Sequence, residues 1–412
     1  MNDNPSISSP SRARFMNSSS PPDRTIIIRS LQLRDYEAVQ ELAAKSWTQE
    51  RASEIEALQD KLEQFQQWYG LLKLARLLPN SNPHPFHLYV AEQQEKICGL
   101  ICVSPFNRTR STWQVQTVLI DFQAAQPQEA LNLKDIGSQL LRHCFETIWE
   151  ARTWLLEVNV SDRDTLALYR QNGFQPLAQM TYWDITSEIV LELAQHKPSL
   201  PNLLPVSNAE AQLLYQLDTV SMPPLLRQVF DRHIQDFKTP LLRSTAAKFE
   251  RLVKQTEVAS AYVFEPQRKA AIGYFKLESF QEDKAHKLKI TVHPAYTWLY
   301  PELFAQMAGL IKEKKVRSLE VVSADYQPER EEYLEKLGAE RQEHTLLMSR
   351  SVWHKLRETR REGLQLSDML QGLKPARTPV PSRIHWLKSF RVKPSESHSQ
   401  ENNKHNPPEA TS

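Results

Sequence analysis

A small-residue pair, Gly137 and Ser138, opens the helix expected at residues 136–149. The first turn of an α-helix has backbone N–H groups without partners in the helix and a partial positive charge. Because small side chains let the backbone approach a ligand, this pair could hold a pyrophosphate without a basic side chain. Asp135, which directly precedes the pair, could instead serve as the N-cap of the helix.

The elements that must position this pair occur twice in the chain. The sequence has only 9 glycines in 412 residues. Four of them mark matching places, in the strands around Gly99 and Gly273 and after the helices that end near Gly173 and Gly338. Between them lie the matching strands WLLEV at 154–158 and SLEVV at 318–322. This repeated order indicates one fold duplicated in one chain.

Two segments resemble a known family. IGSQLL at 136–141 is similar to the pyrophosphate loop of the GNAT superfamily, the CoA-dependent N-acyltransferases, and LEVNVSDRDTLALYRQNGF at 156–174 is similar to its strand, helix and Gly-Phe ending. The order of expected strands and helices agrees over residues 25–187. The resemblance implies an α/β (α+β, mixed-sheet) fold built as two tandem GNAT-like domains.

The resemblance also assigns catalytic roles. It places Tyr169, four residues before Gly173, as the general acid that protonates the departing thiolate. A phenol suits this role because its pKa, near 10, is comparable with that of the thiol. Glu157 could accept the proton of the amine, but the same glutamate recurs in the second copy, so a structural role is equally open.

The co-substrate implied by the resemblance is acetyl-CoA, and no metal is expected. Main-chain groups of a strand would pair with the pantetheine arm, and the loop before the helix would hold the pyrophosphate. Asp162 would lie near the pantetheine or, alternatively, cap the next helix. The expected cofactor-binding residues are therefore Val118, Leu119, Ile120, Ile136, Gly137, Ser138, Gln139 and Asp162.

The second copy lacks both chemical elements. The segment HPAYTWLYPELF runs from a strand into the helix expected at 301–313 and has no Gly-x-Gly element. Leu334 stands four residues before Gly338, and the neighbouring Tyr333 points to another face of the helix. We therefore expect a GNAT-like domain without catalysis, which shapes the substrate cleft or binds a partner.

Composition sets the outer limits of the prediction. We expect a disordered segment at 1–23, a GNAT-like acyltransferase domain at 24–195, a degenerate GNAT-like domain at 206–358 and a disordered basic and polar tail at 373–412. The net charge of +2 gives no general nucleic-acid signal. The longest apolar run, Ile97–Val103, is too short to span a membrane, and no secretory signal is expected. These features predict a soluble cytoplasmic protein.

The sequence predicts transfer of an acetyl or other acyl group from CoA to an amine, catalysed by the first domain. The alternative is a non-catalytic tandem scaffold or protein-binding module. In that case the tail segment 374–393, with six basic and no acidic residues, would dock on a protein or on an anionic partner. The expected acceptor is an amine of a small molecule or of a protein.

Overall fold

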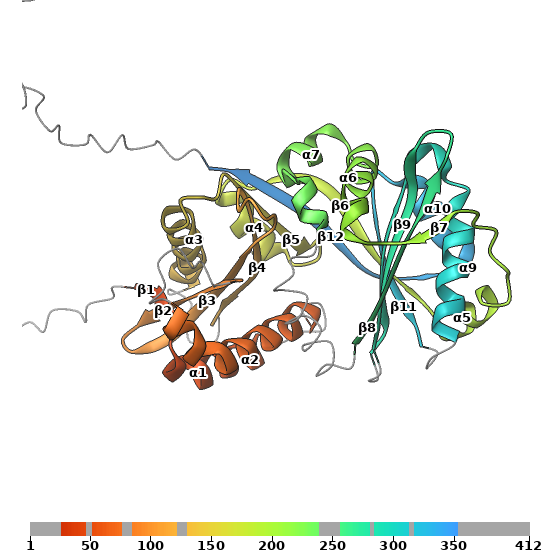
Figure 1. Ribbon diagram of the computed structural model, residues 1–412. Helices are drawn as coiled ribbons and strands as arrows, with labels where there is room; N and C mark the ends of the chain where they lie inside the picture. The colour runs from red at the N-terminus through yellow and green to blue at the C-terminus, as the bar shows by residue number, and fades with distance from the viewer. Residues whose placement is uncertain are drawn as a thin grey trace, which may run out of the picture. The chain divides into compact units, whose positions relative to one another are not determined.

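The computed structural model describes residues 26–46, 52–75, 85–121, 130–238, 256–280, 284–312 and 317–352 (Figure 1). The described residues belong to one compact unit that ends at His354. The two tails expected at 1–23 and 373–412, with the basic segment 374–393, lie outside the described residues. None of the described helices is long and apolar enough to cross a membrane.

A mixed sheet of twelve strands runs through this unit in the order β1-β2-β3-β4-β5-β12-β6-β11-β10-β9-β8-β7. Neighbouring strands are antiparallel, except that β4 pairs with β5 and β10 with β11 in parallel. The N-terminal half of the chain supplies β1 Ile27–Ser30, β2 His87–Gln93, β3 Lys96–Pro105, β4 Thr112–Ile120, β5 Thr153–Asn159 and β6 Gln175–Ile185. The C-terminal half supplies β7 Leu203–Pro205, β8 Thr256–Glu265, β9 Ala270–Phe280, β10 His286–Val292, β11 Leu319–Ala324 and β12 Glu340–Ser351.

Each half has the same succession of elements from its first strand to its last. In the N-terminal half the helices are α1 Tyr36–Lys45, α2 Ala52–Ala75, α3 Ala130–Thr147, α4 Arg163–Gln171 and α5 Ser187–Leu193. In the C-terminal half they are α6 Ala211–Val220, α7 Pro224–Phe230, α9 Leu299–Lys312 and α10 Pro328–Leu337. This is the order that the resemblance to the GNAT superfamily implies, so the predicted mixed-sheet α/β fold with a duplicated unit is confirmed.

The helices of the N-terminal half cover both faces of its strands. Along β4, Trp113, Val115 and Val118 belong to a buried cluster with α3 and α4, whereas Leu119 packs with α1 and α2. Successive side chains of a strand point to opposite faces, so these contacts place α3 and α4 on one face and α1 and α2 on the other. The two faces are called the α3–α4 face and the α1–α2 face below.

The two halves exchange their last strands. Strand β12 lies between β5 and β6, and β6 in turn lies between β12 and β11. The end of α7 is also tied to the loop between β3 and β4, because Asn107 Nδ2 donates to the carbonyls of Phe230 and Asp231 at 3.2 and 2.8 Å. Each half therefore contains a strand of the other. The boundaries 24–195 and 206–358 stay a prediction.

Candidate active site

The parallel pairing of β4 and β5 stops partway along both strands. Paired residues run from Thr112 and Thr153 to Val115 and Leu156. Beyond this point β4 continues beside β3, and β5 continues beside β12. The two strands thus separate, and the predicted pantetheine-binding residues 118–120 lie on the β4 side of the separation.

Strand β4 carries a bulge at the same point. Cys102 of β3 pairs with Thr117, whereas Val103 pairs with Val115, so Gln116 is the extra residue. Its side-chain carbonyl accepts hydrogen bonds from Lys61 of α2 and from the Cys102 thiol. Such a bulge bends the strand and leaves one residue outside the regular ladder. It therefore helps to turn β4 away from β5.

Glu157 is the first residue of β5 beyond the paired region. Its neighbours Leu156 and Val158 belong to the cluster on the α3–α4 face, so the alternation of the strand directs Glu157 to the α1–α2 face. One oxygen, Oε1, accepts hydrogen bonds from Tyr182 Oη at 2.8 Å and from Thr345 Oγ1. Burial and the nearby Glu157 carboxylate raise the pKa of Tyr182 well above its usual value. Tyr182 is therefore a protonated donor.

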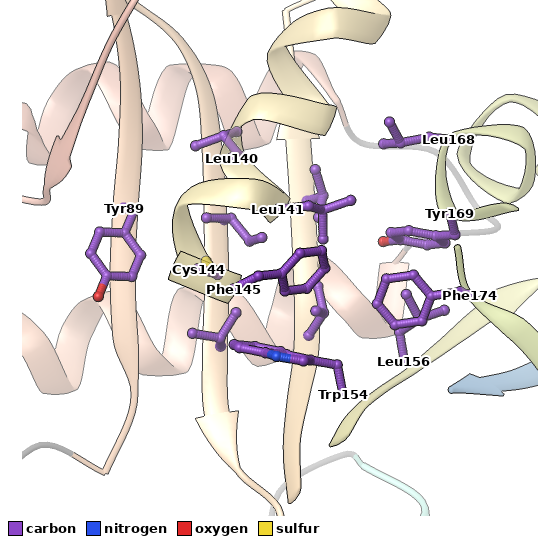
Figure 2. Close-up of a cluster of buried hydrophobic side chains, with 14 of the residues drawn as sticks. Tyr89, Leu140, Leu141, Cys144, Phe145, Trp154, Leu156, Leu168, Tyr169 and Phe174 are labelled. Atoms are coloured by element: carbon purple, nitrogen blue, oxygen red, sulfur yellow. The ribbon is translucent and has the colours of Figure 1, made fainter. Parts of the chain in front are cut away.

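Tyr169 lies on the opposite face. Its side chain is 4% exposed, and its ring packs edge-on against Phe174 with the ring centroids 5.8 Å apart. Figure 2 shows both rings close to Leu156, the last residue of β5 that pairs with β4. The two predicted catalytic residues, Tyr169 and Glu157, thus come from opposite faces of the sheet near the point where β4 and β5 separate.

The expected start of the next helix was wrong. Helix α3 begins at Ala130, so Ile136, Gly137, Ser138 and Gln139 lie inside it. Backbone N–H groups in a helix interior donate to the carbonyl four residues earlier, and these four amides cannot form the expected loop around a pyrophosphate. Asp135 is likewise no N-cap, and its carboxylate accepts a hydrogen bond from Gln139 Nε2 at 3.0 Å.

The structure gives Gly137 a packing role. A Cβ atom at this position would lie 2.7 Å from Leu168 Cδ2 and 2.9 Å from Ile120 Cδ1. The absence of a side chain lets α3 approach α4 and β4 closely. Ser138 adds a direct link between the helices, since its Oγ accepts a hydrogen bond from Asn172 Nδ2 at 2.8 Å. Contact of these residues with a cofactor stays a prediction.

Asp162 occupies the second of its two expected roles. It is the N-cap of α4, and its Oδ1 accepts a hydrogen bond from the Thr165 N–H at 3.0 Å. This bond satisfies one of the amides that the helix itself leaves without a partner. Within the described part of the chain, no group of three or more His, Cys, Asp or Glu residues could hold a metal ion.

The C-terminal half has a corresponding separation, but it is filled. Pairing of β10 with β11 ends at Leu288 and Val321, and β9 and β10 pair without a register shift, so β10 has no bulge. Arg330 of α10, 5% exposed, reaches across this gap. Its Nη1 donates to the Val322 carbonyl and its Nη2 to the Ile290 carbonyl, both at 2.9 Å.

The residues that correspond to Tyr169 in the C-terminal half serve packing. Leu334 is fully buried. Tyr333 stacks on Tyr300 with the ring centroids 6.2 Å apart, and burial raises its pKa to about 12. The absence of a catalytic tyrosine from this half stays a prediction.

Four residues of the two separations were not found from the sequence: Gln116, Tyr182, Thr345 and Arg330. Arg330 alone left a signal. It stands eight residues before Gly338, where the first copy has Thr165 eight residues before Gly173, and a long basic side chain at a buried helix position requires hydrogen-bond partners. The other three depend on pairing between strands that are distant in sequence.

Comparison with known proteins gives structural similarity only. No protein-family model matches the sequence, and no curated protein matches it. A GCN5-related N-acetyltransferase from Sphaerobacter thermophilus is similar at 13% identity, with 81% of this chain and 97% of that chain covered and a TM-score of 0.47. A tandem GNAT protein from the clavulanic acid biosynthesis pathway is 14% identical over 79% of this chain and 98% of its own, with a TM-score of 0.46. A Drosophila protein is 15% identical over 80% and 99% of the two chains, with a TM-score of 0.45. Similarities at this level assign no activity or substrate to the chain.

Proposed function

We propose that the chain is an acyl-CoA-dependent N-acyltransferase whose reaction takes place where β4 and β5 separate. The observation that carries the proposal is the arrangement at this point, with Glu157 on the α1–α2 face and Tyr169 on the α3–α4 face. An extended ligand arm can bind along a strand as an additional strand would. The pantetheine arm of acetyl-CoA would bind along residues 118–120 in this way.

The two residues divide the proton transfers between them. Glu157 accepts a proton from the amine nitrogen, directly or through a water molecule, and the nitrogen attacks the thioester carbonyl. As the C–N bond forms, the C–S bond breaks, and Tyr169 donates its phenolic proton to the departing sulfur. General acid and base groups at fixed positions typically accelerate such steps by about 10²–10⁴-fold each.

We assign the reaction to the N-terminal half because of Arg330. In the C-terminal half its guanidinium occupies the separation between β10 and β11 and binds a carbonyl of each strand. A ligand arm would have to displace a buried cation from two hydrogen bonds. In the N-terminal half the residue at the corresponding helix position is Thr165, which is too short to span such a gap.

The test is to place the same side chain in the N-terminal half. Thr165→Arg should lower the affinity for acetyl-CoA at least about tenfold, the equivalent of about 1.4 kcal/mol, when titrated by calorimetry on the full chain. Thr165→Val serves as the matched control and should bind as the wild type does. Equal binding by all three proteins would place the thioester elsewhere.

A non-catalytic scaffold is the second candidate, and helix α3 favours it. The amides of residues 136–139 lie inside this helix, so the phosphate-binding loop expected from the resemblance is not formed there. If the wild-type chain binds no acetyl-CoA in the same titration, the scaffold takes precedence. The segment 374–393 would then be the first place to seek a protein or anionic partner.

A further inference from the structure

The strand next to Glu157 comes from the other half of the chain. Strand β12 pairs with β5 in antiparallel register, with Leu347 opposite Glu157 and Thr345 opposite Asn159. Thr345 is 4% exposed, and its Oγ1 donates to the Glu157 carboxylate. Two residues after Glu157 on β5, Asn159 Nδ2 donates to Glu343 Oε1 at 3.1 Å. The C-terminal half thus contacts the proposed proton acceptor directly.

Both hydrogen bonds to Glu157 end on one carboxylate oxygen. Tyr182 Oη at 2.8 Å and Thr345 Oγ1 both donate to Oε1, and no described residue donates to Oε2. Two donors from neighbouring strands, β6 and β12, fix the rotation of the carboxylate. Oε2 is left to accept a proton.

We infer that Thr345 and Tyr182 are positioning residues for Glu157, so that the C-terminal half completes the catalytic site of the N-terminal half. The inference rests on the proposed function, because Glu157 needs a fixed orientation for catalysis only if it accepts the proton of the amine. It also gives the half with the filled separation a role in the reaction. That role is carried by one exchanged strand.

The charged groups around Glu157 are mainly acidic. Glu343 on β12 is close enough to interact electrostatically with Glu157 and with Glu54 of α2, and burial raises the pKa of Glu343 above its ordinary value. Glu320 on β11 interacts electrostatically with Tyr182. The ammonium group of Lys61 on α2 donates a hydrogen bond to Gln116 Oε1. The two donated hydrogen bonds hold the Glu157 carboxylate in place among these acidic groups.

The experiment compares four variants of the full chain. Thr345→Val removes the hydroxyl and keeps the branched shape, Thr345→Ser restores a hydroxyl, and Tyr182→Phe removes the second donor. Thr181→Val is the matched control, since Thr181 is a buried threonine of β6 whose hydroxyl contacts Glu331 and His344 instead. Activity is followed as thiol release from acetyl-CoA with the best acceptor among spermidine, kanamycin and a lysine-containing peptide.

Thr345→Val and Tyr182→Phe should each lower kcat about tenfold, as expected for one hydrogen bond to a charged group, with KM for acetyl-CoA unchanged. The acidic limb of the pH–rate profile should move to higher pH, because fewer donors stabilise the ionised carboxylate. Thr345→Ser should restore both properties. A wild-type profile in Thr345→Val, or an equal loss in Thr181→Val, would overturn the inference.

A second measurement separates this inference from the proposed function. The titration midpoint of the Glu157 carboxyl is followed by 13C NMR, with the signal assigned from Glu157→Gln. It should be higher in Thr345→Val than in the wild type whether or not any amine is acylated. Absence of acyl transfer by the wild type would refute the proposed function and, with it, the catalytic role of Thr345 and Tyr182. An unchanged midpoint would refute the hydrogen bond between Thr345 and Glu157.

Discussion

The two parallel strand pairs of the sheet start alike and end differently. Both β4–β5 and β10–β11 pair over a few residues and then separate. In the N-terminal half the separation begins at a bulge and has Glu157 just beyond it. In the C-terminal half there is no bulge, and Arg330 lies in the gap. The two copies of the fold thus share the separation of their parallel strands but differ in the side chains that lie there.

The difference shows what a strand separation requires. Buried carbonyl groups need hydrogen-bond donors, and two strands that part no longer supply them to each other. In the C-terminal half the guanidinium of Arg330 supplies two such donors from within the chain. Its Cζ atom lies 5.8 Å from the centroid of the Tyr300 ring, and its buried Nε has no hydrogen-bond partner among the described residues. The two bonds to carbonyls and the ring contact must therefore offset its desolvation. The proposed assignment of the reaction to the N-terminal half rests on this difference.

The largest expected difference in turnover between the halves concerns Glu157 and Glu320, the glutamates of the matching segments WLLEV and SLEVV. Glu157→Gln keeps the shape and can still accept from Tyr182, but it cannot take a proton. Turnover should fall about 10²–10⁴-fold. Glu320→Gln, the corresponding change in the C-terminal half, should leave turnover unchanged, because Glu320 pairs with Lys287 at 3.8 Å and is half exposed. Similar losses in both variants, measured as steady-state thiol release, would break the comparison.

The second difference concerns the helix tyrosines. Tyr169→Phe keeps the ring against Phe174 and removes the proposed proton donor, so kcat should fall about 10²-fold with the affinity for acetyl-CoA maintained. Tyr333→Phe removes a hydroxyl from the stacked pair with Tyr300 and should not change kcat. Wild-type turnover in Tyr169→Phe would show that the phenol is not the acid.

The third difference is one of stability. Arg330→Met keeps an unbranched side chain but leaves the carbonyls of Ile290 and Val322 without these donors. The free energy of unfolding should fall by about 3 kcal/mol, since each unsatisfied buried group costs about 1–3 kcal/mol. Lys336→Met on the same helix, with a side chain 71% exposed, should change it by less than about 0.5 kcal/mol. The free energies of unfolding of the two variants are compared by urea denaturation followed by circular dichroism. Equal losses would mean that the two hydrogen bonds of Arg330 do not stabilise the chain.

Much of the fold could be predicted from the sequence because it depends on local signals. The duplicated glycines mark real helix ends, as Gly173 and Gly338 have φ angles of +81° and +82°, which few other residues adopt. The LEV segments form β5 and β11 as expected. The order of elements follows from such signals together with hydrophobic periodicity.

The site was harder to predict because its decisive contacts are not local. The donors to Glu157 come from Tyr182 and Thr345, which reach it only through the pairing of β12 with β5 and its contact with β6. No single-strand pattern reveals that exchange. The start of α3 was misplaced for a local reason: Asp135 and Gly137 resemble a cap and a loop, but the helix starts earlier, at Ala130, and tertiary packing accommodates both residues.

The smallest expected difference compares the glycines inside the corresponding helices α3 and α9. A helix-interior glycine replaced by alanine gains about 1 kcal/mol in helix propensity. At Gly309 no atom lies within 4 Å of the added Cβ, so Gly309→Ala should raise the free energy of unfolding by about this amount.

At Gly137 the same gain is opposed by contacts of 2.7 and 2.9 Å with Leu168 and Ile120. Overpacking of a core typically costs about 1–3 kcal/mol, so Gly137→Ala should be neutral or destabilising by up to about 2 kcal/mol. Thermal denaturation of the two single variants decides the matter. If Gly137→Ala stabilises the chain as much as Gly309→Ala does, α3 does not pack closely at this glycine. The absence of a side chain at residue 137 would then need an explanation other than packing against Leu168 and Ile120.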